Sequence, residues 1–195
     1  HYIGSVTALG DTHEVVTSQA VFTRNGIKLV ERGTRVNSAF REKLVQHKLL
    51  PPIDQCLSVA GGVTQASLRD RAREILDTEP RFQLLRSALP GVERLLNAFY
   101  AMPLSPPLAF KLTVAREQRP AVYEHSVQMT LIALFLAIKS RMSDRDLATV
   151  AAAGMLHDIG DLHIDPELLR PGRRLDASEL RHVYAHPMTA YLILQ

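Results

Sequence analysis

Histidines gather between residues 125 and 186 of this chain. Histidine is the side chain most often used for metal binding and for proton transfer near neutral pH. His157 is followed directly by Asp158, so an imidazole and a carboxylate stand side by side, and both are ordinary ligands of divalent transition metals. Five of the eight histidines lie in this region: His125, His157, His163, His182 and His186.

The elements around these residues are predicted to be helices that can bring them together. Residues 151–156 read Ala-Ala-Ala-Gly-Met-Leu, small and apolar enough to let neighbouring helices approach and bury His157 and Asp158. A buried charge is costly unless it is paired or bound to a metal. His125 and His186 each lie near the start of another predicted helix, and helical bundles build metal sites from facing helices. The sequence therefore predicts one site shared by these four residues.

The second half of the chain reads as helix throughout. Helices are expected over 108–118 and 120–141, then from the cap Ser143 to about residue 158, from a capping box of Asp176 and Glu179, and from His186 onward. In the helix over 120–141 the expected core positions are Val127, Leu131, Leu134 and Ile138, together with the stripe Met129, Leu131, Ile132 and Leu136.

The first half is predicted to hold a small α+β module over residues 1–60. Residues 1–13 show little pattern and are expected to be a loose lead-in, whereas Asn25-Gly26 predicts a hairpin between two alternating segments. A helix is expected from Ser38, and a strand over 53–59 that adds to the hairpin. A helical connector over 61–107 ends in a proline-dense boundary at 102–107. The expected fold class is mainly α, this module being followed by an all-helical bundle over 108–195 that is C-terminally incomplete.

Composition excludes several classes of protein. Hydrophobic residues make up 46% of the 195 residues and charged residues 22%, which excludes disordered, collagen-like and disulfide-scaffold chains. The net charge of +3 is scattered over residues 1–110, without the dense basic run expected of a protein that binds a nucleic acid polymer. The single cysteine, Cys56, lies in an apolar segment and is predicted to be a buried hydrophobe in a reducing cytoplasm.

Two further expectations concern membranes and the ends of the chain. No run reaches the roughly 18 consecutive apolar residues that a membrane span needs, so no membrane partner is expected. The chain starts at His1 rather than Met and stops within an apolar helical pattern, so it is interpreted as a piece of a longer protein.

The ordered motifs of residues 120–195 resemble the HD-GYP branch of the HD phosphohydrolase superfamily. They are His125-Ser126, then His157-Asp158-Ile159-Gly160, then Pro171-Gly172, and finally His186-Pro187. Members are all-helical, bind two or three iron or manganese ions, and hydrolyse cyclic di-GMP. The resemblance implies that His125, His157, Asp158 and His186 are metal ligands, with Asp158 also catalytic as a bridge between two metals that holds the attacking hydroxide.

This chain departs from the family pattern at several positions. The motif lysine that contacts substrate phosphate is replaced by Asp161, a candidate catalytic residue whose carboxylate would repel phosphate or offer another metal contact. The glycine of the His-Pro motif is Ala190, and the His-His pair and GYP motif would lie beyond Gln195. Ala121 stands where some members carry a glutamate ligand, so two metals are expected rather than three.

Basic residues near the motifs are candidates for substrate binding. Arg170, Arg173 and Arg174 surround Pro171-Gly172, where they either form a solvated loop or grip guanine and phosphate. His182 is a further candidate four residues before His186, and His163 either approaches the site or lies in a solvated loop.

Two main functional hypotheses follow, and a third, an HD phosphohydrolase that acts on another nucleotide, differs from the first in substrate only. The first is a cytoplasmic, metal-dependent cyclic di-GMP phosphodiesterase of bacterial signalling with an N-terminal regulatory or dimerising module. The second is a degenerate HD domain that acts as a non-catalytic signalling or nucleotide-binding module. A homodimer or a signalling protein is the expected partner, besides the cyclic dinucleotide.

Overall fold

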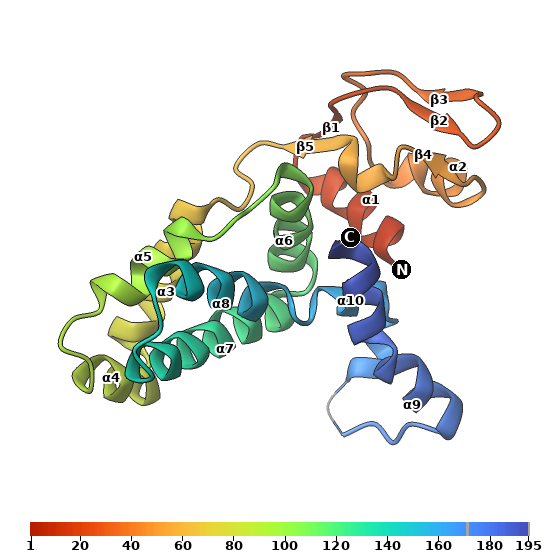
Figure 1. Ribbon diagram of the computed structural model, residues 1–195. Coiled ribbons are helices and arrows are strands. Elements are labelled where there is room, and N and C mark those ends of the chain that lie inside the picture. The colour runs from red at the N-terminus through yellow and green to blue at the C-terminus, as the bar shows by residue number, and fades with distance from the viewer. Residues whose placement is uncertain (171, 195) are drawn as a thin grey trace. The chain divides into compact units, whose positions relative to one another are not determined.

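The computed structural model describes residues 1–170 and 172–194, and its chain divides into two compact units (Figure 1). The first unit holds residues 1–62, 105–120 and 159–195, and the second holds 63–104 and 121–158. The protein is mainly helical with a small strand region near the N-terminus, which confirms the predicted fold class. The domain boundaries expected near residues 60 and 107 stay a prediction.

The second unit is a group of packed helices. Thr64 caps the first of them with a reciprocal box to Ser67, and the Ser143 hydroxyl accepts from the Asp146 amide at the start of another. The largest fully buried side chains of this unit are aliphatic, apart from Phe99. The helices are α3 (Gln65–Thr78), α4 (Pro80–Ser87), α5 (Glu93–Ala101), α7 (Pro120–Lys139, of which the first residue is assigned to the other unit) and α8 (Asp144–Leu156).

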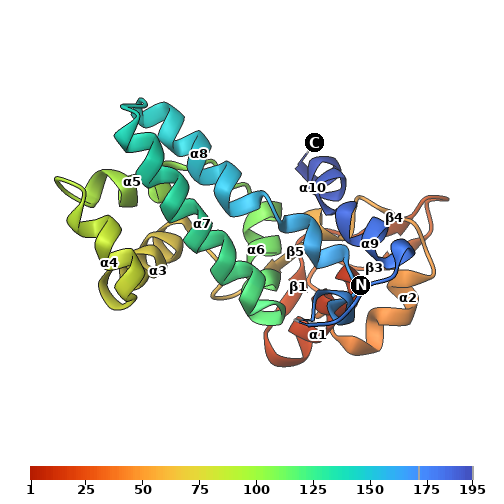
Figure 2. The same cartoon turned by 90° about the horizontal axis from the view of Figure 1, so that it is seen from below.

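Helices α7 and α8 position the predicted metal ligands of this unit, which lie on α7 and directly after α8, and the two helices run side by side in both views (Figure 2). By length and composition α7 could cross a membrane, a test that core helices of soluble proteins also pass. Val127, Leu131 and Leu134 are buried as predicted. The second expected stripe is wrong at three of its four positions: Met129, Ile132 and Leu136 are exposed, and only its Leu131 is buried.

The first unit combines helices with two small antiparallel sheets. One sheet pairs β1 with β5, and the other has the order β3-β2-β4. Its α-helices are α1 (Tyr2–Thr12), α2 (Arg41–Val45), α6 (Pro106–Gln118), α9 (Ala177–Tyr184) and α10 (His186–Leu194). Its strands are β1 (Val15–Thr17), β2 (Val21–Thr23), β3 (Lys28–Val30), β4 (Leu49–Leu50) and β5 (Leu57–Val59). Short 3₁₀ helices are η1 (Ser38–Phe40), η2 (Ile53–Gln55), η3 (Ile159–His163) and η4 (Pro166–Leu169).

In this unit the local sequence signals predicted a turn and a helix start correctly, but they did not predict which strands pair. The hairpin predicted at Asn25-Gly26 joins β2 and β3, and Gly26 has the positive φ of 80° that its turn requires. The predicted capping box of Asp176 and Glu179 opens α9. The strand expected over 53–59 is shorter, and it pairs with β1 instead of the hairpin, whose free edge is taken by β4.

The expected loose lead-in over residues 1–13 is wrong, because this segment forms α1. Val6 and Leu9 are fully buried, and Gly10 comes so close to the neighbouring chain that a Cβ there would lie 1.7 Å from the Val36 carbonyl oxygen. Close packing, rather than a strong amphipathic pattern, therefore stabilises this helix.

Candidate metal centre

Three of the predicted ligands form a cluster in the second unit. His125 is on α7, and His157 and Asp158 directly follow α8. The Asp158 Oδ2 atom lies 2.9 Å from His157 Nε2 and 3.6 Å from His125 Nε2. The side chains are 52%, 36% and 19% exposed for His125, His157 and Asp158, so the cluster is open to solvent on one side.

A backbone hydrogen bond sets the proton position of His157. Its Nδ1 atom lies 2.8 Å from the Gly154 carbonyl oxygen. A carbonyl can only accept, so Nδ1 carries the proton and Nε2 presents its lone pair. Metal-binding histidines characteristically donate their second ring N–H in this way.

The electrostatics of the cluster favour a bound cation. The Nε2 lone pair of His157 faces a carboxylate oxygen at 2.9 Å, and a second imidazole nitrogen faces the same oxygen. Facing lone pairs repel each other, so the arrangement requires a positive charge between them. A proton or a metal ion supplies that charge.

The distances fit a divalent metal closely. One ligand atom each from His125, His157 and Asp158 lies within 4.8 Å of the others. Two atoms that each lie about 2.1 Å from a metal are at most about 4.2 Å apart, so the cluster needs to contract by about 0.6 Å at most. Two histidines and one carboxylate leave coordination positions open, as catalytic metal sites do.

Two contacts hold the helices that carry the ligands. Arg71 on α3 binds the carboxylate of Glu124 in a forked pair, with Nη2 2.7 Å and Nε 3.0 Å from the two oxygens, and Glu124 is the neighbour of His125. Gly154 on α8 lies against Thr130 on α7, where a Cβ would come within 2.5 Å of the Thr130 hydroxyl oxygen. The first contact was not predicted, because nothing local in the sequence links residues 71 and 124.

The fourth predicted ligand, His186, belongs to the first unit. Its Nδ1 atom lies 2.8 Å from the Val183 carbonyl oxygen, so it has the same proton position as His157. Gly160 permits η3 to pack on α10, because a Cβ there would lie 2.1 Å from the His186 carbonyl oxygen and 3.0 Å from the Ala190 amide. The replacement of the family glycine by Ala190 is accommodated here, with Ala190 buried against Gly160.

Asp161 also belongs to the first unit. Its Oδ1 atom lies 3.9 Å from His186 Nδ1. Burial lowers the pKa of Arg119, and the negative charges of Asp161 and Asp165 oppose that effect. Asp161 therefore lies in a mixed-charge neighbourhood of its own unit, and its catalytic role stays a prediction.

The candidate substrate residues all lie in the first unit. Arg170 pairs with Glu167 at 2.8 Å, and Arg173 pairs with Glu179. Arg174 and His182 are exposed, and no hydrogen bond or ion pair of their side chains is found within residues 1–170 and 172–194. The structure thus brings together His125, His157 and Asp158, and it leaves the role of the three arginines and His182 a prediction.

Comparison with protein families gives one match. Residues 122–195 match the model of the HD domain, and this segment includes parts of both compact units. Neither curated proteins nor solved structures gave a match to the chain. The matched segment contains the whole His125, His157 and Asp158 cluster and also His186. Residues 122–195, less than half of the chain, are therefore similar to the HD domain, whose superfamily consists of metal-dependent phosphohydrolases.

Proposed function

We propose that this chain is a cytoplasmic, metal-dependent phosphodiesterase that hydrolyses cyclic di-GMP in bacterial second-messenger signalling. The observation that carries the proposal is the cluster of His125, His157 and Asp158 inside a segment that matches the HD domain. Iron or manganese is the proposed metal, with His186 as a further ligand and two ions in the complete site. Imidazole and carboxylate ligands suit these metals.

The residues of this chain hold the reaction centre in place. A bound metal lowers the pKa of a coordinated water and polarises the phosphate. The Gly154 carbonyl fixes the proton of His157 on Nδ1, which keeps Nε2 available as a ligand. Asp158 lies close enough to both imidazoles to share a metal with them and to accept a hydrogen bond from a nucleophilic water. Arg71 orients the first turn of α7 through Glu124.

Substrate phosphate would be bound by basic residues other than the missing motif lysine. Arg170, Arg173, Arg174 and His182 are the candidates. The carboxylate partners of Arg170 and Arg173 are on the surface, where an ion pair contributes only about 0–1 kcal/mol. Replacing such an ion pair by a bidentate hydrogen-bonded contact between the arginine and a phosphate therefore costs little free energy.

The second candidate function is a non-catalytic nucleotide-binding or signalling module. Asp161 favours it, because a carboxylate at this position repels a phosphodiester instead of binding it. Such a module would keep metal or nucleotide affinity without turnover. In either case we propose a homodimer or a signalling protein as partner, and neither a nucleic acid polymer nor a membrane.

Metal content and hydrolysis together test the proposal. The chain is purified with iron or manganese, metal is measured by elemental analysis, and cyclic di-GMP hydrolysis is followed chromatographically. Asp158→Asn is compared with Asp70→Asn, a matched control on α3 whose exposed side chain makes no hydrogen bond or ion pair within the described ranges. We expect metal and hydrolysis in the parent and in the control, and loss of both with Asp158→Asn.

Each other outcome has a definite meaning. Metal binding and nucleotide binding without hydrolysis would favour the non-catalytic module. Metal content that is equal in Asp158→Asn and Asp70→Asn would refute the assigned ligand set. Hydrolysis of a generic phosphodiester such as bis(4-nitrophenyl) phosphate, but not of cyclic di-GMP, would retain the phosphohydrolase and reject the proposed substrate.

A further inference from the structure

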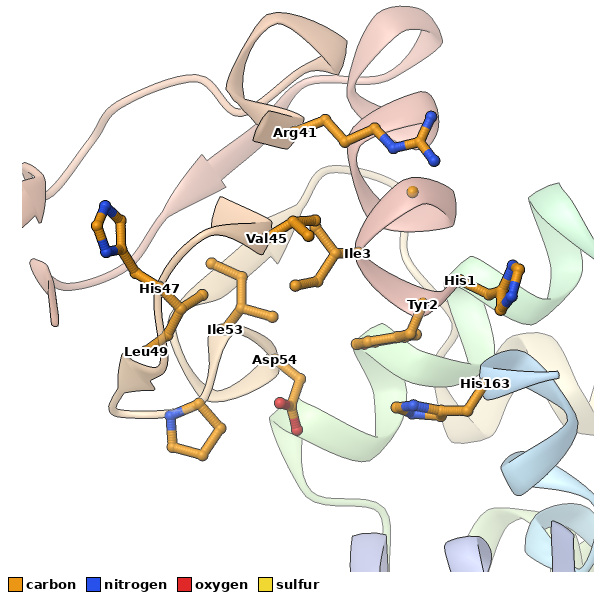
Figure 3. Close-up of a pocket in the computed structure, with 12 residues that line it drawn as sticks. His1, Tyr2, Ile3, Arg41, Val45, His47, Leu49, Ile53, Asp54 and His163 are labelled. Atoms are coloured by element: carbon orange, nitrogen blue, oxygen red, sulfur yellow. The ribbon is translucent and has the colours of Figure 1, made fainter. Parts of the chain in front are cut away.

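The first unit contains a cavity that the proposed phosphodiesterase reaction does not use. Its volume is about 520 Å³, within the range of small-molecule sites. Residues from α1, α2, the segment around β4 and η2, and the end of η3 line it. Figure 3 shows Arg41 at one end of the lining residues and Asp54 and His163 at the other, with Ile3 and Val45 between them.

The end of the cavity formed by Tyr2 and His163 contains two polar atoms without a partner. The Tyr2 hydroxyl and His163 Nε2 are buried and make no hydrogen bond within the described part of the chain. Their rings stack with centroids 4.9 Å apart, and Tyr2 is only 5% exposed. An unsatisfied buried polar group is destabilising, so a ligand that formed hydrogen bonds with these two atoms would remove that cost. Both are shielded from bulk water, and reaching them requires a shift of the side chains around them.

The two unpartnered groups at this end of the cavity, the Tyr2 hydroxyl and the His163 imidazole, are uncharged, and the N-terminal amino group lies near enough to act on His163. The buried ammonium group of Lys111 forms an ion pair with Asp54 and lies 4.8 Å from the centre of the Tyr2 ring. Burial lowers the pKa of His163 to about 4, so its imidazole is uncharged at pH 7. Burial also raises the pKa of Tyr2, which therefore keeps its proton. These groups suit an uncharged partner that can accept and donate hydrogen bonds.

The opposite end carries a free positive charge. Arg41 is exposed, and its guanidinium group has no ion pair or hydrogen bond to any residue that the structure describes. Between the two ends the lining is aliphatic, from Ile3, Val45, Leu49 and Ile53. A molecule that matches this order has an anionic group, an apolar body and an uncharged polar group.

We propose that this cavity binds a small amphipathic organic anion. Its carboxylate or phosphate group pairs with Arg41, and its apolar body contacts Ile3, Val45 and Ile53. An uncharged hydroxyl or amide at the far end bonds the Tyr2 hydroxyl and His163 Nε2. The proposal is independent of the metal centre, and it gives the first unit a ligand-sensing role.

Three matched probes test the proposal on the metal-free, full 195-residue chain. They are 3-(4-hydroxyphenyl)propionate, 3-phenylpropionate, which lacks the hydroxyl, and 3-(4-hydroxyphenyl)propionamide, which lacks the charge. Dissociation constants are measured by protein-observed NMR titration, because molecules of this size bind on the order of millimolar. We expect the hydroxyl to improve affinity about two- to tenfold and the carboxylate about two- to fivefold.

Variants assign each gain to a residue. Tyr2→Phe should remove the gain from the probe hydroxyl but keep the gain from its charge, and Arg41→Gln should do the reverse. Tyr100→Phe and Arg145→Gln, both exposed and outside the cavity lining, are the matched controls. Val45→Trp at the exposed edge of the cavity should abolish binding of all three probes. Circular dichroism of each variant confirms that it is folded.

Three results would overturn the proposal. The first is no binding of any probe to the folded parent. The second is binding that Val45→Trp leaves unchanged, and the third is a set of affinities in which the probe hydroxyl and charge show no coupling to Tyr2 and Arg41. Because no metal is present, a failure here is distinguishable from a failure of the phosphodiesterase proposal.

Discussion

Substitution of Gly154 by alanine should disturb the metal centre from a position that is not a ligand. A Cβ at residue 154 would lie 2.5 Å from the Thr130 hydroxyl oxygen and 3.0 Å from the Thr130 Cα atom. Ordinary contacts between such atoms begin near 3.5 Å. Helices α7 and α8 must therefore separate by about 0.5–1 Å, or Thr130 must leave the position in which its hydroxyl bonds the Ser126 carbonyl.

Two opposing terms decide the net effect on stability. Overpacking costs about 1–3 kcal/mol, and a clash with backbone as well as side chain belongs in the upper half of that range. Alanine is the better helix former by about 1 kcal/mol. The free energy of unfolding should thus fall by about 1–2 kcal/mol, which lowers the melting temperature of a chain of this size by roughly 2–8 °C.

Metal affinity should fall more steeply than stability. The displaced helix carries His157, whose proton position depends on the Gly154 carbonyl, while His125 stays with α7. A shift of about 0.5–1 Å would add to the contraction of up to about 0.6 Å that the ligand atoms already need, so the metal affinity should fall. Calorimetric melting and metal titration measure the two effects.

Thr130→Ala in the Gly154→Ala background is the internal control. It removes the hydroxyl oxygen at 2.5 Å and should restore part of both losses, although the new methyl group still lies 3.0 Å from the backbone of residue 130. A Gly154→Ala variant that melts higher than the parent and binds metal equally well would refute this account of the helix packing.

Four further predictions concern the first unit. Tyr2→Phe should stabilise the ligand-free protein by about 1–3 kcal/mol in chemical denaturation, because it removes an unpaired buried hydroxyl; a loss would mean that the hydroxyl has a partner. Lys111→Ala should cost about 3–5 kcal/mol, since Asp54 keeps its charge without a partner, and Lys111→Met with Asp54→Leu should cost less. The pKa of His163 is about 4 in the folded protein and 6.5 in the unfolded chain, so its contribution to stability is complete above pH 6.5 and declines as the pH falls towards 4. His163→Gln should therefore reduce the dependence of the melting temperature on pH between 6.5 and 4. Asp161→Lys should destabilise more than Asp161→Asn and should not raise hydrolysis, because it places a cation beside His186 and Arg119.

Short-range signals in the sequence predicted the local structure well. Ser143 and Asp176 begin helices as their capping chemistry requires, and Asn25-Gly26 forms the predicted turn. Each of these features depends on residues within four positions of one another. Nothing distant needs to be known in order to predict them.

Long-range packing explains what the sequence did not predict. Helix α1 has no capping side chain and only a weak apolar face, and packing against α6 and η1 completes it. The exposed face of α7 could not be distinguished from its buried face, since both are rich in aliphatic residues. The pairing of β5 with β1 depends on strands about 40 residues apart, for which the sequence has no local signal.

The candidate site was predicted in part for the same reason. His157 and Asp158 are adjacent, and the motif order pointed to His125, so chemistry and spacing were sufficient to predict that these three residues lie together. The Arg71–Glu124 pair and the packing of Gly154 on Thr130 join residues that are far apart in the chain. Such supporting interactions have no short motif, although they decide how precisely the ligands are held.

Asp161 shows how a residue at a motif position is matched to the charges around it. A family lysine at this position would place its charge beside Arg119 and His186, whereas the aspartate opposes the charge of Arg119 and lies 3.9 Å from His186. The substitution is therefore electrostatically consistent with its own unit, and it need not be a simple loss of function. It follows that restoring the lysine alone is a poor test of catalysis. The decisive comparison is metal and turnover at His125, His157 and Asp158.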